Sequence, residues 1–568
     1  MDSLKRRGPR RCLYVTRACD SCKRRKVKCD GEQPCASCRI SETACCYTVV
    51  PQKRGRVPRP AAPPPSWSPI TTPKRSDQEF AGPSPSPSPS PRVELNAPCT
   101  SATASDHQSP TLTHGASPST TFSSAVYEPD AKHIRQGFAE DVSRLMMIGT
   151  VDQLVSHCID LFMQYIFPNT PVCHEPMLRA GAATFKHLDS ATTLQPTYAR
   201  TFTLVTALCA LVLAVAPDFG FPERARLTMV FLRASRAMLM TYIEHDLEHP
   251  DWTSLIIRVW HSSATQNVTG RNGAAFHYYN EASTLALRLR LYQEESIIGK
   301  PPLEAQLLRS NFWQLYLSDK SATVFDDRKC FVTEHVFPGQ LTLLERSSPE
   351  IPLLDITRRQ FSPLLESRFH EGHLLKRQIW RDGANLITAI KALKGDSNED
   401  HLTGLFLRFT GLIDSFPRWL WNPEHYLNGS YDADISNHHR TCFWVQRSSI
   451  IMPFHTIKLT ILETCIESKV PGVMGLDHKQ LSWHQRKMDI SRDFLSELEM
   501  VPFICLKMQG EPTVQRVRKV GTGLLEIIQN ATDEDLKTRA QAQLRQLLET
   551  LARLDSRASD EPRYRDLG

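Results

Sequence analysis

Residues 18–47 read ACDSCKRRKVKCDGEQPCASCRISETACCY, and this stretch decides how the chain is organised. Its cysteines follow the spacing C-x2-C-x6-C-x5-C-x2-C-x6-C and are Cys19, Cys22, Cys29, Cys35, Cys38 and Cys45. The half C-x2-C-x6-C therefore occurs twice, joined by a five-residue loop. Two thiolates with two residues between them, at the end of one helical turn, can bind the same metal ion.

Zinc is the metal that this set of thiols favours, because tetrahedral Zn²⁺ takes four thiolates. Six thiolates satisfy one ion with two left over, or two ions if two sulfurs bridge, and the second arrangement uses every sulfur. The segment from Cys19 to Cys45 contains no histidine, which argues against mixed Cys/His fingers, and its short loops argue against ribbon and cross-brace modules. We therefore expect structural zinc rather than free thiols or disulfides.

The charge of the chain is concentrated beside these cysteines. Residues 1–60 hold 16 Lys and Arg against 5 Asp and Glu, whereas the rest of the chain holds 52 against 56. A basic N-terminal part on a mildly acidic remainder indicates that the N-terminus alone contacts a polyanion, for which double-stranded DNA is the expected partner.

The first half of the cysteine repeat carries five of these cations between its cysteines, whereas the second half has only Arg39. We expect the first short helix to face the major groove, with Asp20 as its N-cap, because Lys and Arg donate to guanine or to phosphates. Four further cations follow the cluster, Lys53, Arg54, Arg56 and Arg59, and they suit phosphate contacts, a nuclear import signal, or both. The predicted DNA-binding residues are Lys23, Arg24, Arg25, Lys26, Lys28, Lys53 and Arg54.

Composition divides the chain into a basic tail (1–17), the cysteine-rich domain (18–50), a linker (51–126), a large domain (127–556) and a C-terminal tail (557–568). Residues 51–120 contain 16 Pro and 12 Ser, which predicts an extended, disordered linker. A chain that begins MDSLKRRGPRR and continues polar has no secretory signal, so we expect a nuclear protein.

Helical periodicity recurs throughout the large domain, which predicts an all-α body. One face combines Ala282, Leu285, Ala286 and Leu289, a second Leu308, Phe312, Leu315 and Tyr316, and a third Leu402, Leu405, Phe406, Phe409, Leu412 and Ile413. The apolar run 201–216 is shorter than a membrane span needs, so we expect a buried helix and no membrane partner. The C-terminal apolar positions of 536–554 indicate core packing more than a zipper.

The cysteine segment closely resembles the DNA-binding domain of the fungal binuclear zinc cluster (Zn₂Cys₆) transcription factors, over about 30 residues. The resemblance implies two Zn²⁺ ions bridged by Cys19 and Cys35, with Cys22 and Cys29 completing one site and Cys38 and Cys45 the other. Cys46 stands beside the sixth ligand and is the alternative to Cys45. The family's base-reading pair corresponds to Arg25 and Lys26, and its preferred DNA word resembles a CGG triplet.

Parts of the large domain resemble the middle homology region of the same regulators. The residues that carry this resemblance are 167–176, 279–291 and 308–320, although Phe325-Asp326-Asp327-Arg328 replaces the usual Gly-Arg-Pro turn. The resemblance implies a regulatory domain that could hold a small effector. The resemblance leaves open whether the protein forms a homodimer, whether it contacts coregulators, and whether it activates or represses transcription. It also leaves open whether the target genes belong to a catabolic pathway or to a secondary-metabolite gene cluster.

Enzyme signatures are weak by comparison. His245-Asp-Leu-Glu248-His249 matches the zinc-binding HxxEH pattern, but Pro250 follows at once and would end the helix that the pattern needs. We therefore expect a transcription regulator and not an enzyme. The alternative is a zinc-dependent interaction module in a corepressor that reaches DNA through partners.

Overall fold

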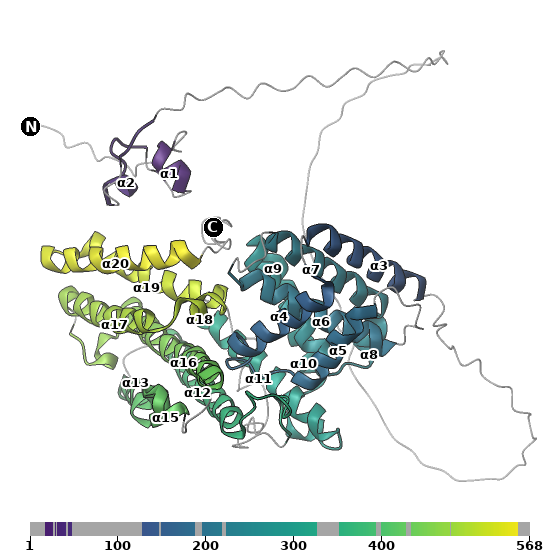
Figure 1. The fold of residues 1–568 in the computed structure, drawn as a ribbon. Helices are drawn as coiled ribbons and strands as arrows, with labels where there is room; N and C mark the ends of the chain where they lie inside the picture. The colour runs from purple at the N-terminus through teal and green to yellow at the C-terminus, as the bar shows by residue number, and fades with distance from the viewer. Residues whose placement is uncertain are drawn as a thin grey trace, which may run out of the picture. The chain divides into compact units, whose positions relative to one another are not determined.

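The computed structural model describes residues 18–25, 29, 31–40, 44–47, 128–146, 149–187, 196–217, 223–325, 351–393, 399–427, 433–477 and 479–554. The chain divides into two compact units, residues 1–121 and 122–568, which we call the head and the body. Within the described residues every regular element is helical (Figure 1). The predicted combination of a small cysteine-rich domain and a large all-α domain is therefore confirmed, and the predicted linker lies outside the described residues.

The head contains two short helices, α1 (Asp20–Arg25) and α2 (Ala36–Ile40), which contact each other. Among the residues of the head that the structure describes, the buried apolar ones are all cysteines, with Cys45 and Tyr47 packed against them. A unit this small cannot bury enough apolar surface to fold by that means alone, so its fold depends on a metal.

The described residues of the first part of the body form helices α3 to α11 (Figure 1). They are α3 (Glu128–Leu145), α4 (Val151–Tyr165), α5 (Glu175–Ala183), α6 (Pro196–Val215), α7 (Arg224–Thr241), α8 (Ile243–Glu248), α9 (Trp252–Thr269), α10 (Asn272–Arg288) and α11 (Pro302–Phe325). Helix α6 packs against α4, α7 and α9, and α10 packs against α9.

The second part of the body is arranged around one long helix, α16. Its members are α12 (Pro363–Lys391), α13 (Glu399–Gly411), α14 (Arg418–Trp421), α15 (Pro423–Leu427), α16 (Ala433–Glu467), α17 (Gln480–Met500), α18 (Phe503–Lys507), α19 (Glu511–Asn530) and α20 (Glu534–Leu554). Helix α16 contacts α12, α17, α18 and α19, and it also reaches α4 and α11 of the first part. The two parts therefore share one continuous core.

The predicted helix faces are confirmed. The residues of the three sets that are fully buried are Ala282, Leu285, Ala286, Leu308, Phe312, Leu315, Tyr316, Leu402, Phe406, Phe409 and Leu412, and Leu289, Leu405 and Ile413 are partly buried against the same core. Helix α20 packs on α19 with Leu544 and Leu547 buried, as expected of a core helix.

Two helices, α6 and α16, are long and apolar enough to cross a membrane by length and composition, and in both the apolar stretch is 83% buried inside the body. In α6 the buried threonine hydroxyls donate hydrogen bonds to backbone carbonyls of the preceding turn. Thr203 donates to the Ala199 carbonyl at 2.8 Å and Thr206 to the Phe202 carbonyl at 2.7 Å. Such bonds let hydroxyls lie in an apolar core, because buried polar groups need partners.

Helices α12 and α16 approach each other most closely at two glycines of α12. A Cβ on Gly372 would lie 2.5 Å from Gln446 Nε2, and a Cβ on Gly383 would overlap Ile457 Cγ2. The contacts are eleven residues apart on both helices, which therefore run parallel. Only glycine permits this approach.

Candidate metal centre and nucleic-acid interface

Each helix of the head begins directly after a cysteine whose sulfur caps it. Cys19 Sγ accepts a hydrogen bond from Cys22 N at 3.3 Å, and Cys35 Sγ accepts one from Cys38 N at 3.4 Å. Each sulfur thus takes the place of the usual capping oxygen. The predicted N-cap Asp20 is instead the first residue of α1, so the prediction was wrong by one position. The negative charge of Asp20 still lies in the first turn, where it suits the helix dipole.

The repeat in the sequence reappears as a repeat in the hydrogen bonds. Cys19 N donates to Cys29 Sγ at 3.4 Å, and in the second half Cys35 N donates to Cys45 Sγ at 3.3 Å. The third cysteine of each half is thereby fixed against the first cysteine of the same half, although six residues separate it from the second.

The six sulfurs form two groups of four that share two members. One group is Cys19, Cys22, Cys29 and Cys35, the other is Cys19, Cys35, Cys38 and Cys45, and the sulfurs within each group lie within 4.8 Å of one another. Sulfurs at about 2.3 Å from a tetrahedral zinc ion are roughly 3.8 Å apart. The observed separations are 3.8 Å for Cys19 to Cys35, 3.4 Å for Cys19 to Cys38 and 3.5 Å for Cys22 to Cys35. The donor set therefore fits two zinc ions with two shared thiolates.

Burial and backbone donors act in opposite directions on these thiols. Burial raises the pKa of Cys35 well above its ordinary value. At Cys29 burial also raises the pKa, but hydrogen bonds from the N–H groups of Cys19 and Gly31 and from the side chains of Tyr47 and Cys35 together lower it to about 6. Zinc binding requires thiolates, so metal binding at this centre releases protons.

Cys45 and Cys46 are distinguished by their positions. Cys45 belongs to the second group of sulfurs, whereas Cys46 is exposed and accepts a hydrogen bond from Asp20 N through its carbonyl at 2.8 Å. Tyr47, which the sequence analysis did not single out, donates from its hydroxyl to the Glu32 carbonyl at 3.0 Å and lies 3.6 Å from Cys29 Sγ. The sequence signal that could have identified Tyr47 as part of the metal centre is its position directly after Cys45 and Cys46.

The predicted DNA-binding residues are only partly described. The backbone of Lys23, Arg24 and Arg25 forms the second half of α1. Their side chains, like the whole of Lys26, Lys28, Lys53 and Arg54, lie outside the described residues. On α2 Arg39 is exposed. The first three cations of the first cysteine repeat, Lys23, Arg24 and Arg25, therefore lie on α1, the helix whose N-terminus is capped by the sulfur of Cys19.

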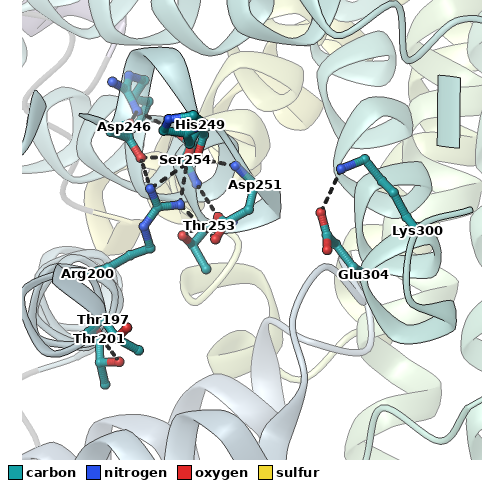
Figure 2. Close-up of polar contacts among 11 residues, drawn as sticks. Thr197, Arg200, Thr201, Asp246, His249, Asp251, Thr253, Ser254, Lys300 and Glu304 are labelled. Atoms are coloured by element: carbon teal, nitrogen blue, oxygen red, sulfur yellow. Dashed lines mark hydrogen bonds and ion pairs between the residues drawn. The ribbon is translucent and has the colours of Figure 1, made fainter. Parts of the chain in front are cut away.

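The HxxEH string belongs to a different kind of arrangement (Figure 2). Helix α8 ends at Glu248 and both histidines are exposed. The buried member is Asp246, which accepts hydrogen bonds from Ser254 Oγ at 2.6 Å and Arg258 Nη1 at 2.7 Å. Arg200 on α6 also pairs with Asp246, at 3.0 Å.

The ion pairs of Asp246 give the HxxEH sequence a structural role in the packing of α8. Arg200 pairs in addition with Asp251, the N-cap of α9, at 2.7 Å. The network therefore holds α6, α8 and α9 together, and the exposed rings of His245 and His249 take no part in these ion pairs, although their centroids lie 5.0 Å apart.

Comparison with known proteins agrees with the geometry of the head. A model of the fungal Zn(2)-Cys(6) binuclear cluster domain matches residues 17–54. Similar proteins include Activator of stress genes protein 1 of Candida albicans, 44% identical over 55 residues, and Activator of stress genes 1 of Saccharomyces cerevisiae, 55% identical over 40 residues. Quinic acid utilization activator of Emericella nidulans is 52% identical over 42 residues.

The matched segments are short on both sides. They cover 9%, 7% and 7% of this chain and 6%, 4% and 5% of the three relatives, in the same order. The similarity therefore concerns the head. Residues 17–54 of this chain form a fungal Zn(2)-Cys(6) binuclear cluster domain, which binds two zinc ions through six cysteines.

Proposed function

We propose that the chain is a nuclear, sequence-specific DNA-binding transcription regulator of fungal type, and not an enzyme. The observation that carries this proposal is the pair of four-sulfur groups sharing Cys19 and Cys35, with a basic helix starting at the first shared sulfur. The relatives named as activators support a role in transcription.

In this proposal Cys19 and Cys35 bridge the two ions, Cys22 and Cys29 complete the first site, and Cys38 and Cys45 complete the second. The zinc is structural, because every tetrahedral position is taken by a thiolate and none remains for a substrate. The metal fixes α1, and the chain's own residues do the recognition.

The division of labour among the cations follows from their positions. Arg25 and Lys26 read the bases of a CGG-like triplet in the major groove, where Arg and Lys donate to guanine O6 and N7. Lys23, Arg24, Lys28, Lys53 and Arg54 neutralise phosphates and set affinity without sequence preference. The domain boundaries proposed with this function are 18–50 for the zinc cluster domain within the head, 51–126 for the linker and 127–556 for the regulatory domain within the body.

The test is equilibrium binding of the full chain to a duplex with CGG triplets and to a scrambled duplex. Lys26→Ala should weaken specific binding by about 1–3 kcal/mol and relax discrimination between the duplexes. Arg39→Ala, an exposed cation on α2, is the matched control and should leave discrimination unchanged. If Lys26→Ala discriminates as well as the unsubstituted chain, α1 is not the reading helix.

The same assay separates this proposal from the corepressor alternative. A chain that reaches DNA only through partners would not discriminate between the two duplexes when purified. Genome-wide occupancy of the tagged protein in its host, with Cys19→Ala as control, would then identify the target genes and the spacing of any paired triplets. A second triplet at fixed spacing would indicate a homodimer on DNA.

A further inference from the structure

The interior of the body contains a group of buried cationic and donor side chains on α12 and α19 that the proposed function does not use. Lys376 on α12 is 6% exposed, and Arg516 on α19 is 8% exposed. His373 lies one turn before Lys376 and is 6% exposed. We call Lys376, Arg516, His373 and Thr513 the cationic cluster.

The cluster differs from three other buried cations of the body, each of which has an acidic partner. Elsewhere Arg258 pairs with Asp246 at 2.7 Å, Arg447 with Glu497 at 2.6 Å and Lys487 with Glu526 at 2.5 Å. Lys376 instead donates to neutral oxygens of Asn169, the carbonyl and Oδ1. Across the described part of the body, no carboxylate lies within ion-pair distance of Lys376 or Arg516.

The atoms without partners in the cluster are mostly donors. They are Arg516 Nε and Nη1, the hydroxyl of Thr513 one turn earlier on α19, and both ring nitrogens of His373. Thr513 is completely buried. Buried donors without acceptors are rare in folded proteins, because each loses its hydrogen bonds to water without a replacement. What the cluster lacks is an acceptor that carries negative charge.

The electrostatics of the cluster are those of an uncompensated positive site. Burial and, to a smaller extent, the nearby charge of Arg516 lower the pKa of Lys376 to about 7. Burial also lowers the pKa of Arg516 to about 10. Arg377, the next residue of α12, adds positive charge, but its guanidinium lies over the Trp313 ring at 4.0 Å. An anion in contact with these groups would stabilise all of their charged forms.

We propose that the cationic cluster binds a small oxyanion, the phosphate or carboxylate group of a metabolite, between α12 and α19. Arg516 and Lys376 supply the charge, and Thr513 and His373 supply further hydrogen bonds. Charge-assisted hydrogen bonds from guanidinium and ammonium groups to oxyanions are the strong ones. Since both helices pack on α16, the bound anion would link two neighbours of the central helix.

The experiment is thermal unfolding of the full, zinc-loaded chain, followed by tryptophan fluorescence at constant ionic strength in chloride. Inorganic phosphate and, separately, succinate are the probes. The unfolding midpoint of the body should rise with at least one probe and saturate, because a ligand that binds only the native state stabilises it. Arg516→Met and Thr513→Val should each weaken the apparent affinity, Arg516→Met by about tenfold or more.

The matched control is Arg545→Met, which removes the same charge from an exposed position of α20 and should keep the full response. Arg516→Met should also be no less stable than the unsubstituted chain without probe, because it removes an uncompensated charge. Three results would overturn the proposal: no response to either anion, an undiminished response in both Arg516→Met and Thr513→Val, or a large loss of probe-free stability in Arg516→Met, which would reveal a carboxylate partner. Thr513→Val keeps the charge of the cluster, so it remains informative if Arg516→Met fails to fold.

Discussion

The head and the body reach a stable fold by opposite means. The head has a core of cysteines whose sulfurs are placed for metal, and its two helices have six and five residues. The body has a continuous apolar core, and its longest helix has 35 residues. The comparison teaches that a few metal ligands at fixed spacing can replace a hydrophobic core. We therefore expect the head to unfold when zinc is lost and the body to unfold when its core is disrupted, each without affecting the other.

The largest expected effect follows from removing a shared sulfur from the head. Cys35→Ser takes one ligand from both four-sulfur groups, and structural zinc contributes about 10–16 kcal/mol of apparent binding energy in small domains. Elemental analysis should show zinc falling from two ions per chain toward none, with specific DNA binding lost. The thermal midpoint of the body should not change.

Cys46→Ser is the control for that experiment. Cys46 is exposed and outside both sulfur groups, so the variant should keep two zinc ions. Loss of zinc from Cys46→Ser would show that Cys46 rather than Cys45 completes the second site.

The reverse experiment breaks the body and spares the head. Asp246→Asn removes the buried anionic partner of Arg258 and leaves only Glu281, at 3.3 Å, which should lower the free energy of unfolding by about 3–5 kcal/mol. Urea unfolding measures the loss, and the zinc content should stay at two ions. His245→Ala, one residue earlier and exposed, should change neither quantity. A drop in zinc content in His245→Ala would restore the metalloenzyme interpretation of HxxEH.

A cavity in the core tests how far the apolar packing alone supports the body. Phe409 is completely buried and stacks on Phe454 with ring centroids 5.1 Å apart. Phe409→Ala should cost about 3–5 kcal/mol in urea unfolding. Leu407→Ala, at a 62% exposed position of the same helix, should stay within roughly 0.5 kcal/mol of the unsubstituted chain. Equal losses in both variants would mean that α13 is not packed as described.

The smallest effects concern single methyl groups. Gly383→Ala places a Cβ against Ile457 and should destabilise the body by about 1–3 kcal/mol. At Gly404, where nothing lies within 4 Å, the same change should stabilise helix α13 by roughly 0.5–1 kcal/mol. In urea unfolding, the midpoint should therefore fall in Gly383→Ala and rise in Gly404→Ala. Shifts in the same direction would contradict the close contact between α12 and α16.

How much of this could be predicted from the sequence differs between the two units. In the head the spacing of six cysteines was enough to predict zinc, because ligand geometry is local. The capping of α1 by Cys19 in place of Asp20 was missed, since a thiol is not an ordinary capping group. In the body, periodicity predicted which residues of α10, α11 and α13 are buried.

Long-range partners in the body could not be predicted from periodicity. The pairing of Asp246 with Arg200 joins residues 46 positions apart, and the cationic cluster combines buried residues of α12 and α19. A helix pattern indicates which face is buried but not which helix covers it. The charged residues inside the body were therefore invisible as a group until the fold placed them together.

The two close glycine contacts between α12 and α16 have a mechanical consequence. Because Gly372 meets Gln446 and Gly383 meets Ile457 at equal spacing, a slide of one helix along the other by a single residue would drive two side chains into backbone at once. We therefore expect α12 and α16 to move together as one rigid body. A conformational change in the body would then change the packing of the surrounding helices against this pair and leave the α12–α16 contact itself unchanged.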